Sequence, residues 1–228
     1  MSLTTILSIC ESVGINDQRF VGQTISRNQK IITSEVLTVV PFVFDMRPMN
    51  YLVYSQSRTI LNALRIADKS LEQYLNFGST GWVNYIKYHG QMTSGQIAAC
   101  QWQTSSANKT LVLGSLPTVD PATYLFRIGD FVQVGRYSYI VTADVQRGSG
   151  STVNVPVHRN LIATFVSPIA CVAGEYGTTI SMGGSTYTGT TFPVILTQYP
   201  LYTLMPITND SFISWASTFK AMEAVLPT

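Results

Sequence analysis

Apolar and polar residues alternate along much of the chain with the period of two that is typical of β-strands. The clearest example is Tyr124–Arg159. This segment contains three strand-like runs and two glycine-containing turns, at residues 131–134, 135–136, 137–144, 147–150 and 152–157. Alternation bounded by glycine turns predicts half-buried antiparallel strands. Because the β-branched runs at 31–32 and 36–44 predict further strands, we expect a mainly β (α+β) protein.

One segment has instead the three- and four-residue spacing of an amphipathic helix. Its apolar stripe consists of Ile60, Leu61, Leu64, Ala67, Leu71, Tyr74 and Leu75. Ser57 is the expected N-cap and Gly78 the expected C-terminal cap. The pattern therefore predicts one flanking helix over about residues 57–77, with its stripe buried against a β-layer.

Shorter features carry local predictions. A stripe within residues 3–13 (Leu3, Ile6, Leu7 and Cys10) predicts a short amphipathic helix. Residues 45–50 are expected to form a turn or loop, because proline also restricts the residue before it. We expect residues 148–150 to form a hairpin turn, since the flanking pattern of a dinucleotide-binding loop is missing. A second hairpin is expected around residues 183–184.

From about residue 92, small polar residues alternate with short apolar runs, and longer apolar runs return after about residue 165. We therefore predict an inserted small β-barrel or sandwich module at 92–165, called the insert below. Residues 1–91 and 166–228, called the flanks, are predicted to pair with each other and complete one core. On this division, deleting the insert is expected to leave the remaining core folded.

Charged residues make up only 11% of the 228 residues, against about 25% in an average soluble domain. A surface of neutral polar groups resists association poorly, which favours a subunit whose faces are covered by neighbours over a turn-rich monomer. The net charge is +2, and no basic run is longer than a pair. Direct binding of nucleic acid is therefore a weak hypothesis.

The residue types that build metal and redox sites are scarce. The three cysteines, Cys10, Cys100 and Cys171, are far apart, and His89 and His158 are the only histidines. We expect buried free thiols and neither a disulfide framework nor a zinc site. The first residues lack the pattern of a signal peptide, and no apolar run is long enough to predict membrane insertion.

No constellation in the sequence predicts catalysis. Asp130, His158 and one of many serines could be combined into a triad, but no G-x-S-x-G turn presents a nucleophile. No P-loop lysine follows a glycine-rich loop, and the aspartates are isolated in sequence. We therefore expect no catalytic, cofactor-binding or metal-binding residues and no cofactor, and we expect that the protein is not an enzyme.

Two segments carry a resemblance to a known family. They are TILNALRIADKSLEQYLNFGSTGWVNYIKYHG and YLFRIGDFVQVGRYSYIVTADVQRGSGSTVNVPVHR, the second with the form GD-apolar-Q, Y-x-V-T-x-D-V and G-S-G-x-x-V-x-V. Both resemble structural proteins of contractile bacteriophage tails. The resemblance implies a tail-tube-like β-sandwich or barrel, six copies of which form a ring, with the insert facing outward. It implies no catalytic residues.

The expected function is that of a virion protein: a ring in the baseplate hub or tube start that templates the tail tube. Its expected partners are other copies of itself and other tail and baseplate proteins, including tube and hub, with DNA only passing through the lumen. Assembly is expected in the host cytoplasm. The alternatives are the repeating tail tube protein and a carbohydrate- or receptor-binding β-domain, for which Trp82, Trp102 and Trp215 are candidate sugar platforms.

Overall fold

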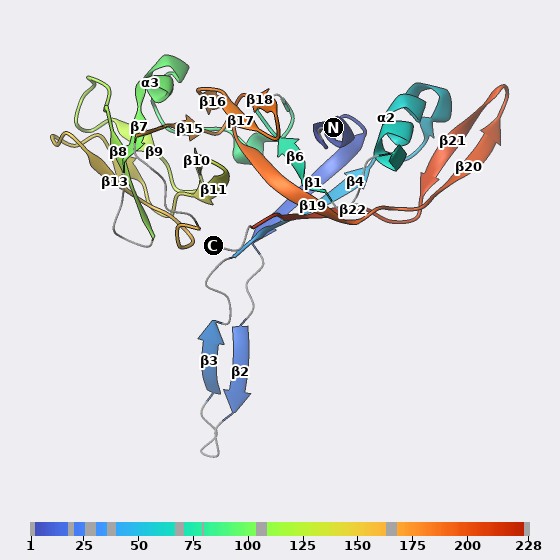
Figure 1. The fold of residues 1–228 in the computed structure, drawn as a ribbon, viewed down its shortest axis with the longest axis horizontal. Helices are drawn as coiled ribbons and strands as arrows, with labels where there is room; N and C mark the ends of the chain where they lie inside the picture. The colour runs from blue at the N-terminus through green and yellow to red at the C-terminus, as the bar shows by residue number, and fades with distance from the viewer. Residues whose placement is uncertain are drawn as a thin grey trace.

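The computed structural model describes residues 3–17, 21–25, 31–35, 40–66, 71–78, 80–103, 109–162 and 168–225, with backbone alone for 21–25 and 31–35. The protein is mainly β, as predicted (Figure 1). Its helices are α1 (Thr4–Leu7), α2 (Tyr54–Ile66), α3 (Ser94–Ala99) and the 3-10 turn η1 (Asn84–Ile86).

The flanks build a five-stranded antiparallel sheet whose strands come from both ends of the chain. Its order is β1 (Cys10–Asp17), β4 (Phe42–Pro48), β22 (Phe219–Glu223), β19 (Thr191–Gln198) and β6 (Gln73–Asn76). β4 pairs with β22, and β6 pairs with β19. The predicted pairing of the two flanks is therefore confirmed.

Two smaller sheets of the flanks extend beyond this sheet. One consists of β20 (Tyr202–Ile207), β21 (Asp210–Trp215) and β5 (Leu52–Val53), beside α2. The other is the hairpin of β2 (Val21–Ile25) and β3 (Ile31–Glu35), which pair only with each other among the described strands. Figure 1 shows this hairpin apart from the other sheets.

The remaining strands form small sheets in and around the insert. One four-stranded sheet has the order β11 (Tyr137–Ile140), β10 (Phe131–Val134), β15 (Val172–Ala173) and β16 (Tyr176–Gly177). A second has the order β13 (Val153–Pro156), β8 (Thr110–Gly114), β7 (Gln101–Gln103) and β14 (Ile169–Ala170). Two pairs complete the set, β12 (Val145–Gln146) with β9 (Tyr124–Phe126), and β17 (Ile180–Met182) with β18 (Ser185–Tyr187).

Most of the buried apolar residues of the described chain form two hydrophobic clusters. The insert core consists of Tyr88, Met92, Ile97, Cys100, Trp102, Leu111, Leu113, Leu125, Phe126, Val132, Val134, Tyr137, Tyr139, Val141, Val145, Val155, Val157, Ile162, Cys171 and Ala173. The flank core consists of Leu3, Ile6, Leu7, Cys10, Phe42, Phe44, Met46, Leu64, Leu75, Phe77, Val83, Ile86, Phe131, Phe192, Val194, Phe219 and Ala221.

The β10–β11 hairpin forms a wall between these clusters. Its Gly135-Arg136 turn is confirmed, with Val134 paired to Tyr137. The expected half-burial is wrong for β10, every residue of which is buried, including Gln133, whereas β13 has exposed Asn154 beside buried Val155. Phe131 belongs to the flank core, while the next residue, Val132, belongs to the insert core. Opposite faces of one strand thus serve different cores.

The predicted helix over 57–77 is only partly correct. α2 begins at Tyr54, so Ser57 lies inside the helix instead of capping it, and β6 replaces the expected last turns. The pairing of β6 with β19 outweighs the local helical pattern. Gly78 is needed for close packing, since a Cβ there would lie 2.0 Å from the carbonyl oxygen of Thr188. Residues 67–70 of this prediction, and 36–39 of a predicted strand, lie outside the described residues.

Three other local predictions need correction. The predicted helix over 3–13 shortens to α1, although its apolar stripe is buried as expected, and β1 begins at Cys10. Residues 45–48 belong to strand β4 and do not form a turn. The loop at 147–150 joins β12 to β13, which pair with β9 and β8, so it is not a hairpin turn. The hairpin at 183–184 is confirmed, with positive φ at both glycines.

Candidate functional site

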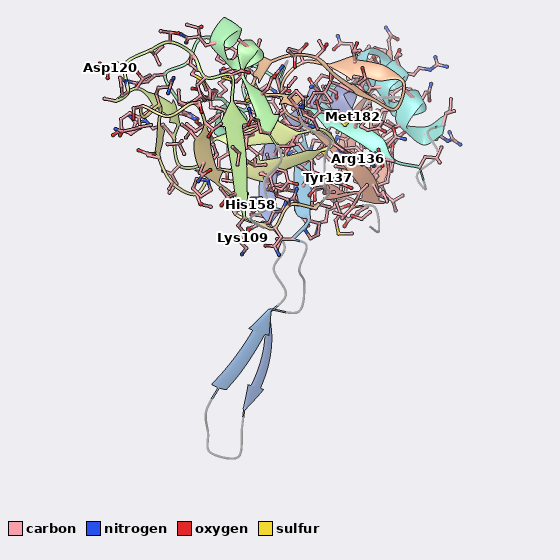
Figure 2. All side chains as sticks on the ribbon, turned by 60° about the vertical axis from the view of Figure 1, so that its left-hand side comes forward. Lys109, Asp120, Arg136, Tyr137, His158 and Met182 are labelled. Carbon is pink, nitrogen blue, oxygen red and sulfur yellow. The ribbon has the colours of Figure 1, made fainter. Side chains whose placement is uncertain are left out.

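Two ion pairs and one contact between a carboxyl group and an imidazole join the insert to the flanks, although the chain has few charges. Each pair has one member in the insert and one in the flanks: Arg159 with Glu223, Asp130 with His89, and Arg136 with Glu72. Figure 2 shows Arg136 and Tyr137 nearer the middle of the molecule than Asp120, which lies at the outer end of the insert. The boundary between the two parts therefore contains one fully buried ion pair and two partly exposed contacts.

The pair of Arg159 and Glu223 is completely buried, with neither side chain exposed. Arg159 Nη1 donates to Glu223 Oε2 at 2.5 Å, and Nη2 donates to Glu223 Oε1 at 2.7 Å. This bidentate arrangement is the geometry that gives a guanidinium and a carboxylate their strongest contact. It connects the segment that follows β13 with β22.

Backbone groups and aromatic rings complete the surroundings of this pair. Arg159 also donates to the carbonyl oxygens of Val40 and Ser138, and Glu223 accepts from the backbone N–H of Phe42. The guanidinium lies 4.7 Å from the ring centroid of Phe42. One arginine therefore contacts three segments of the chain, and losing either charge would leave the other buried without its partner.

Asp130 braces a tight turn at the boundary. Its Oδ1 accepts from the backbone N–H of His89 at 2.8 Å, and its Oδ2 accepts from the backbone N–H of Arg127 at 2.8 Å. Burial raises the pKa of Asp130, and the hydrogen bonds from Arg127 and His89 lower it only in part. The carboxyl group thus holds the turn through one backbone hydrogen bond at each of its oxygens.

Asp130 and His158, which were considered as members of a triad from the sequence, have different partners in the structure. Asp130 pairs with His89, whereas His158 accepts a hydrogen bond from the backbone N–H of Ile140 at its Nδ1. The ring of His158 packs against Phe42, with centroids 5.2 Å apart. Among the described residues, no group of three or more His, Cys, Asp or Glu side chains could hold a metal ion.

The three tryptophans lie in different environments. Trp102 is fully buried, stacks on Phe126 and donates its indole N–H to the carbonyl oxygen of Gln133, so it cannot serve as a sugar platform. Trp215 packs between Tyr202 and Phe219. Trp82 is 45% exposed, and its neighbours in sequence line a hollow of about 190 Å³. This hollow is formed by Phe77, Gly78, Thr80, Gly81, Val83, Ile86, Lys87 and Glu175.

Exposed apolar surface is concentrated on the flanks. Of thirteen large apolar side chains exposed among the described residues, twelve lie outside the insert. They are Met49, Tyr51, Ile66, Leu71, Trp82, Tyr85, Ile195, Leu201, Leu204, Met205, Ile207 and Met222, and the one in the insert is Ile128. The flanks therefore hold most of the large apolar side chains that a partner could cover.

Strand β20 is the most exposed element of that surface. It is an edge strand that pairs only with β21 among the described strands, and five of its six residues are exposed. No charged residue occurs from Thr191 to Asn209. An apolar edge strand without charges invites pairing with another chain, and Pro206 is the usual kind of residue that limits such pairing.

The signals for two of these features differ in kind. The exposed edge strand could have been expected from its uncharged run, whereas nothing in the sequence indicated that Arg159 would be buried.

Comparison of the chain with protein-family models gives no match, and comparison with curated proteins gives none either. In the part of the chain that the structure describes, no helix is both long and apolar enough to cross a membrane.

Proposed function

We propose that the protein is a virion structural protein of a phage tail, forming a ring, six copies in the simplest case, in the baseplate hub or at the start of the tube. The observation that carries the proposal is the uncharged, exposed edge strand β20, within flanks that hold twelve of the thirteen exposed large apolar side chains. Association would cover this surface.

Two further features support assembly. The hairpin β2–β3 has no other strand partner in the described chain, and isolated two-stranded hairpins are marginally stable in water. A neighbouring copy or tail protein would supply the missing support. Head-to-tail contacts need two different surfaces on each copy, and they close into a ring when the rotation permits. The edge strand and the hairpin are two such surfaces.

The test is the mass of the purified protein with a substitution at the edge strand. We expect the unmodified chain to form a ring and Leu204→Asp to dissociate it, because a carboxylate would be buried in the contact. Native mass spectrometry measures the species. Ile128→Asp is the matched control, since Ile128 is 68% exposed but lies in the insert. A monomeric unmodified protein, or equal dissociation by both variants, would contradict the proposal.

The same preparation distinguishes a tube initiator from the repeating tube protein. Rings that stay single favour a tube initiator, whereas open-ended polymers favour the repeating tube protein. A binding domain for carbohydrate is the second candidate, favoured by the exposed Trp82 beside the hollow at Phe77–Lys87. If the protein is a stable monomer that binds glycans, and Trp82→Ala abolishes that binding, the carbohydrate-binding function replaces the ring-forming one.

A further inference from the structure

We propose that Cys100 and Cys171 are a latent disulfide site that closes the neck of the insert. The neck is the place at the base of the insert where β7, near its start, pairs with β14, which follows its last residue. In this antiparallel pair, Trp102 lies opposite Ile169 and Gln101 lies opposite Ala170. The same register places Cys171 opposite Cys100, and Cys171 donates its backbone N–H to the carbonyl oxygen of Cys100 at 3.1 Å.

This placement matches the geometry of a disulfide. Residues directly opposite each other in antiparallel strands have Cα atoms about 4.5–5.5 Å apart, and disulfides join Cα atoms about 4.4–6.8 Å apart. Opposed side chains also lie on the same face of a sheet. Accordingly, both cysteines belong to the insert core and both are fully buried. The third cysteine, Cys10, belongs to the flank core.

The position of the two cysteines determines which part of the chain a disulfide would close into a loop. A bond between Cys100 and Cys171 would close a loop containing residues 101–170, which is nearly the whole insert. A disulfide limits the freedom of the unfolded chain, and in the loop-entropy description the effect grows with loop length. The bond would therefore hold the insert closed at its base without touching its outer surface.

The thiols are protected while the neck is closed. Burial raises the pKa of Cys100 to about 11 and raises the pKa of Cys171 well above its ordinary value, to which the neighbouring Cys100 also contributes. Since the thiolate is the reacting form, oxidation requires the strands to open. The site is thus inert in the closed protein and reacts when the neck loosens.

The oxidant is a small-molecule disulfide, R–S–S–R. The thiolate of Cys100 attacks one sulfur of the oxidant, forming a mixed disulfide and releasing R–S⁻. The thiolate of Cys171 then attacks the Cys100 sulfur, forming the protein disulfide and releasing the second R–S⁻. The two thiol protons end on the two released R–SH molecules, so two protein thiols are oxidised and one small disulfide is reduced.

The experiment oxidises the full chain with oxidised glutathione in mild denaturant and then removes both. We expect one free thiol to remain, Cys10, with the protein mass lower by two hydrogen atoms. Peptide mapping without reduction is expected to find the Cys100–Cys171 bond. A higher thermal unfolding midpoint than that of the reduced protein is also expected, and it should return to the reduced value after dithiothreitol.

Two variants identify which cysteines form the bond. Cys10→Ala should form the same bond, while Cys171→Ala should form none and should show no change in midpoint that dithiothreitol reverses. Should Cys171→Ala fail to fold, the peptide map of Cys10→Ala decides alone. A bond that involves Cys10, or mixed glutathione adducts without the internal bond, would overturn the proposal. An unchanged or lower midpoint of the bonded protein would overturn the role as a closure.

Discussion

The insert core and the flank core are built in opposite ways. All residues of the insert core lie between Tyr88 and Ala173, so the cluster is local in sequence. The flank core combines residues from Leu3 to Ile86 with residues from Phe192 to Ala221, and it borrows Phe131 from the insert. The insert core is nearly self-contained, whereas the flank core requires both ends of the chain and one side chain of its neighbour.

The two parts also differ in the surface that they leave uncovered. The insert exposes a single large apolar side chain among the described residues, and the flanks expose twelve. The resemblance to tail proteins led us to expect that the insert would face outward and make contacts. Most of the exposed large apolar side chains lie on the flanks instead, so we expect the contacts with partners there. The insert then acts on assembly mainly through its attachment to the flanks.

The largest expected effect comes from removing the insert. Deleting residues 92–165 would remove Phe131 from the flank core and leave the buried Glu223 without Arg159. We now expect the remaining flanks to lose cooperative folding, in contrast to the expectation from sequence. Circular dichroism during thermal unfolding measures this. Deleting residues 21–35 is the control, because β2 and β3 pair with no other described strand, and that variant should stay folded.

A folded remainder after removal of the insert would show that the flank core does not depend on the insert. It would mean that the flank core replaces Phe131 and tolerates an unpaired carboxylate, so that the two parts are separate domains. Whether the insert is an independent module stays a prediction until that measurement.

The second effect tests the buried pair that connects the parts. Glu223→Gln should lower the free energy of unfolding by about 3–5 kcal/mol, because it leaves the charge of Arg159 buried. The double variant Arg159→Met with Glu223→Leu should recover most of the loss, since apolar replacements remove both buried charges. Urea unfolding measures both quantities.

A matched pair on the surface provides the control. Arg47 and Glu11 contact each other at 2.9 Å, but their side chains are 62% and 40% exposed. Arg47→Met should therefore cost no more than about 1 kcal/mol. Equal losses in the buried and the exposed pair would show that Arg159 does not connect the two parts.

The sequence predicted the strands of the insert better than their environment. The alternation of apolar and polar residues correctly located β10 and β11. The face of β10 that carries Phe131 is also buried, because Phe192, which lies far along the chain, packs against it. Burial of Arg159 could not be predicted for the same reason, because its partner is 64 positions away. Contacts of this range leave no periodic signal.

Two local errors have more specific causes. Leu71, Tyr74 and Leu75 fit a helical stripe, but such a short stretch also fits a strand, and pairing with β19 decides the outcome. Helix α3 was missed although its signal is present. Thr93 and Gln96 have the spacing of a capping box, and the structure contains both of its hydrogen bonds.

The smallest expected effect is a difference in pH dependence between a buried carboxylate at the boundary, Asp130, and an exposed one on the insert, Asp144. Asp130 and Asp144 both hold the turn at Arg127–Ile128, but only Asp130 also contacts the flanks. Burial raises the pKa of Asp130. The backbone N–H of Ile128, followed by the Arg127 side chain, lowers the pKa of Asp144. The two carboxylates should therefore change stability in opposite directions.

The sign follows from which state holds the proton. Above the unfolded value of about 3.9, folded Asp130 keeps a proton that the unfolded chain has lost, so its contribution to stability falls as the pH rises through the raised pKa. The contribution of Asp144 is present above the unfolded value and is lost as the pH falls through its lowered pKa. Relative to the unmodified protein, Asp130→Asn should gain stability with rising pH, and Asp144→Asn should gain it with falling pH. Urea unfolding from about pH 3 to about pH 7 measures both slopes. Parallel curves for Asp130→Asn and the unmodified protein would mean that the boundary carboxylate does not titrate differently in the folded state, and that burial at this junction is looser than in the two cores it separates.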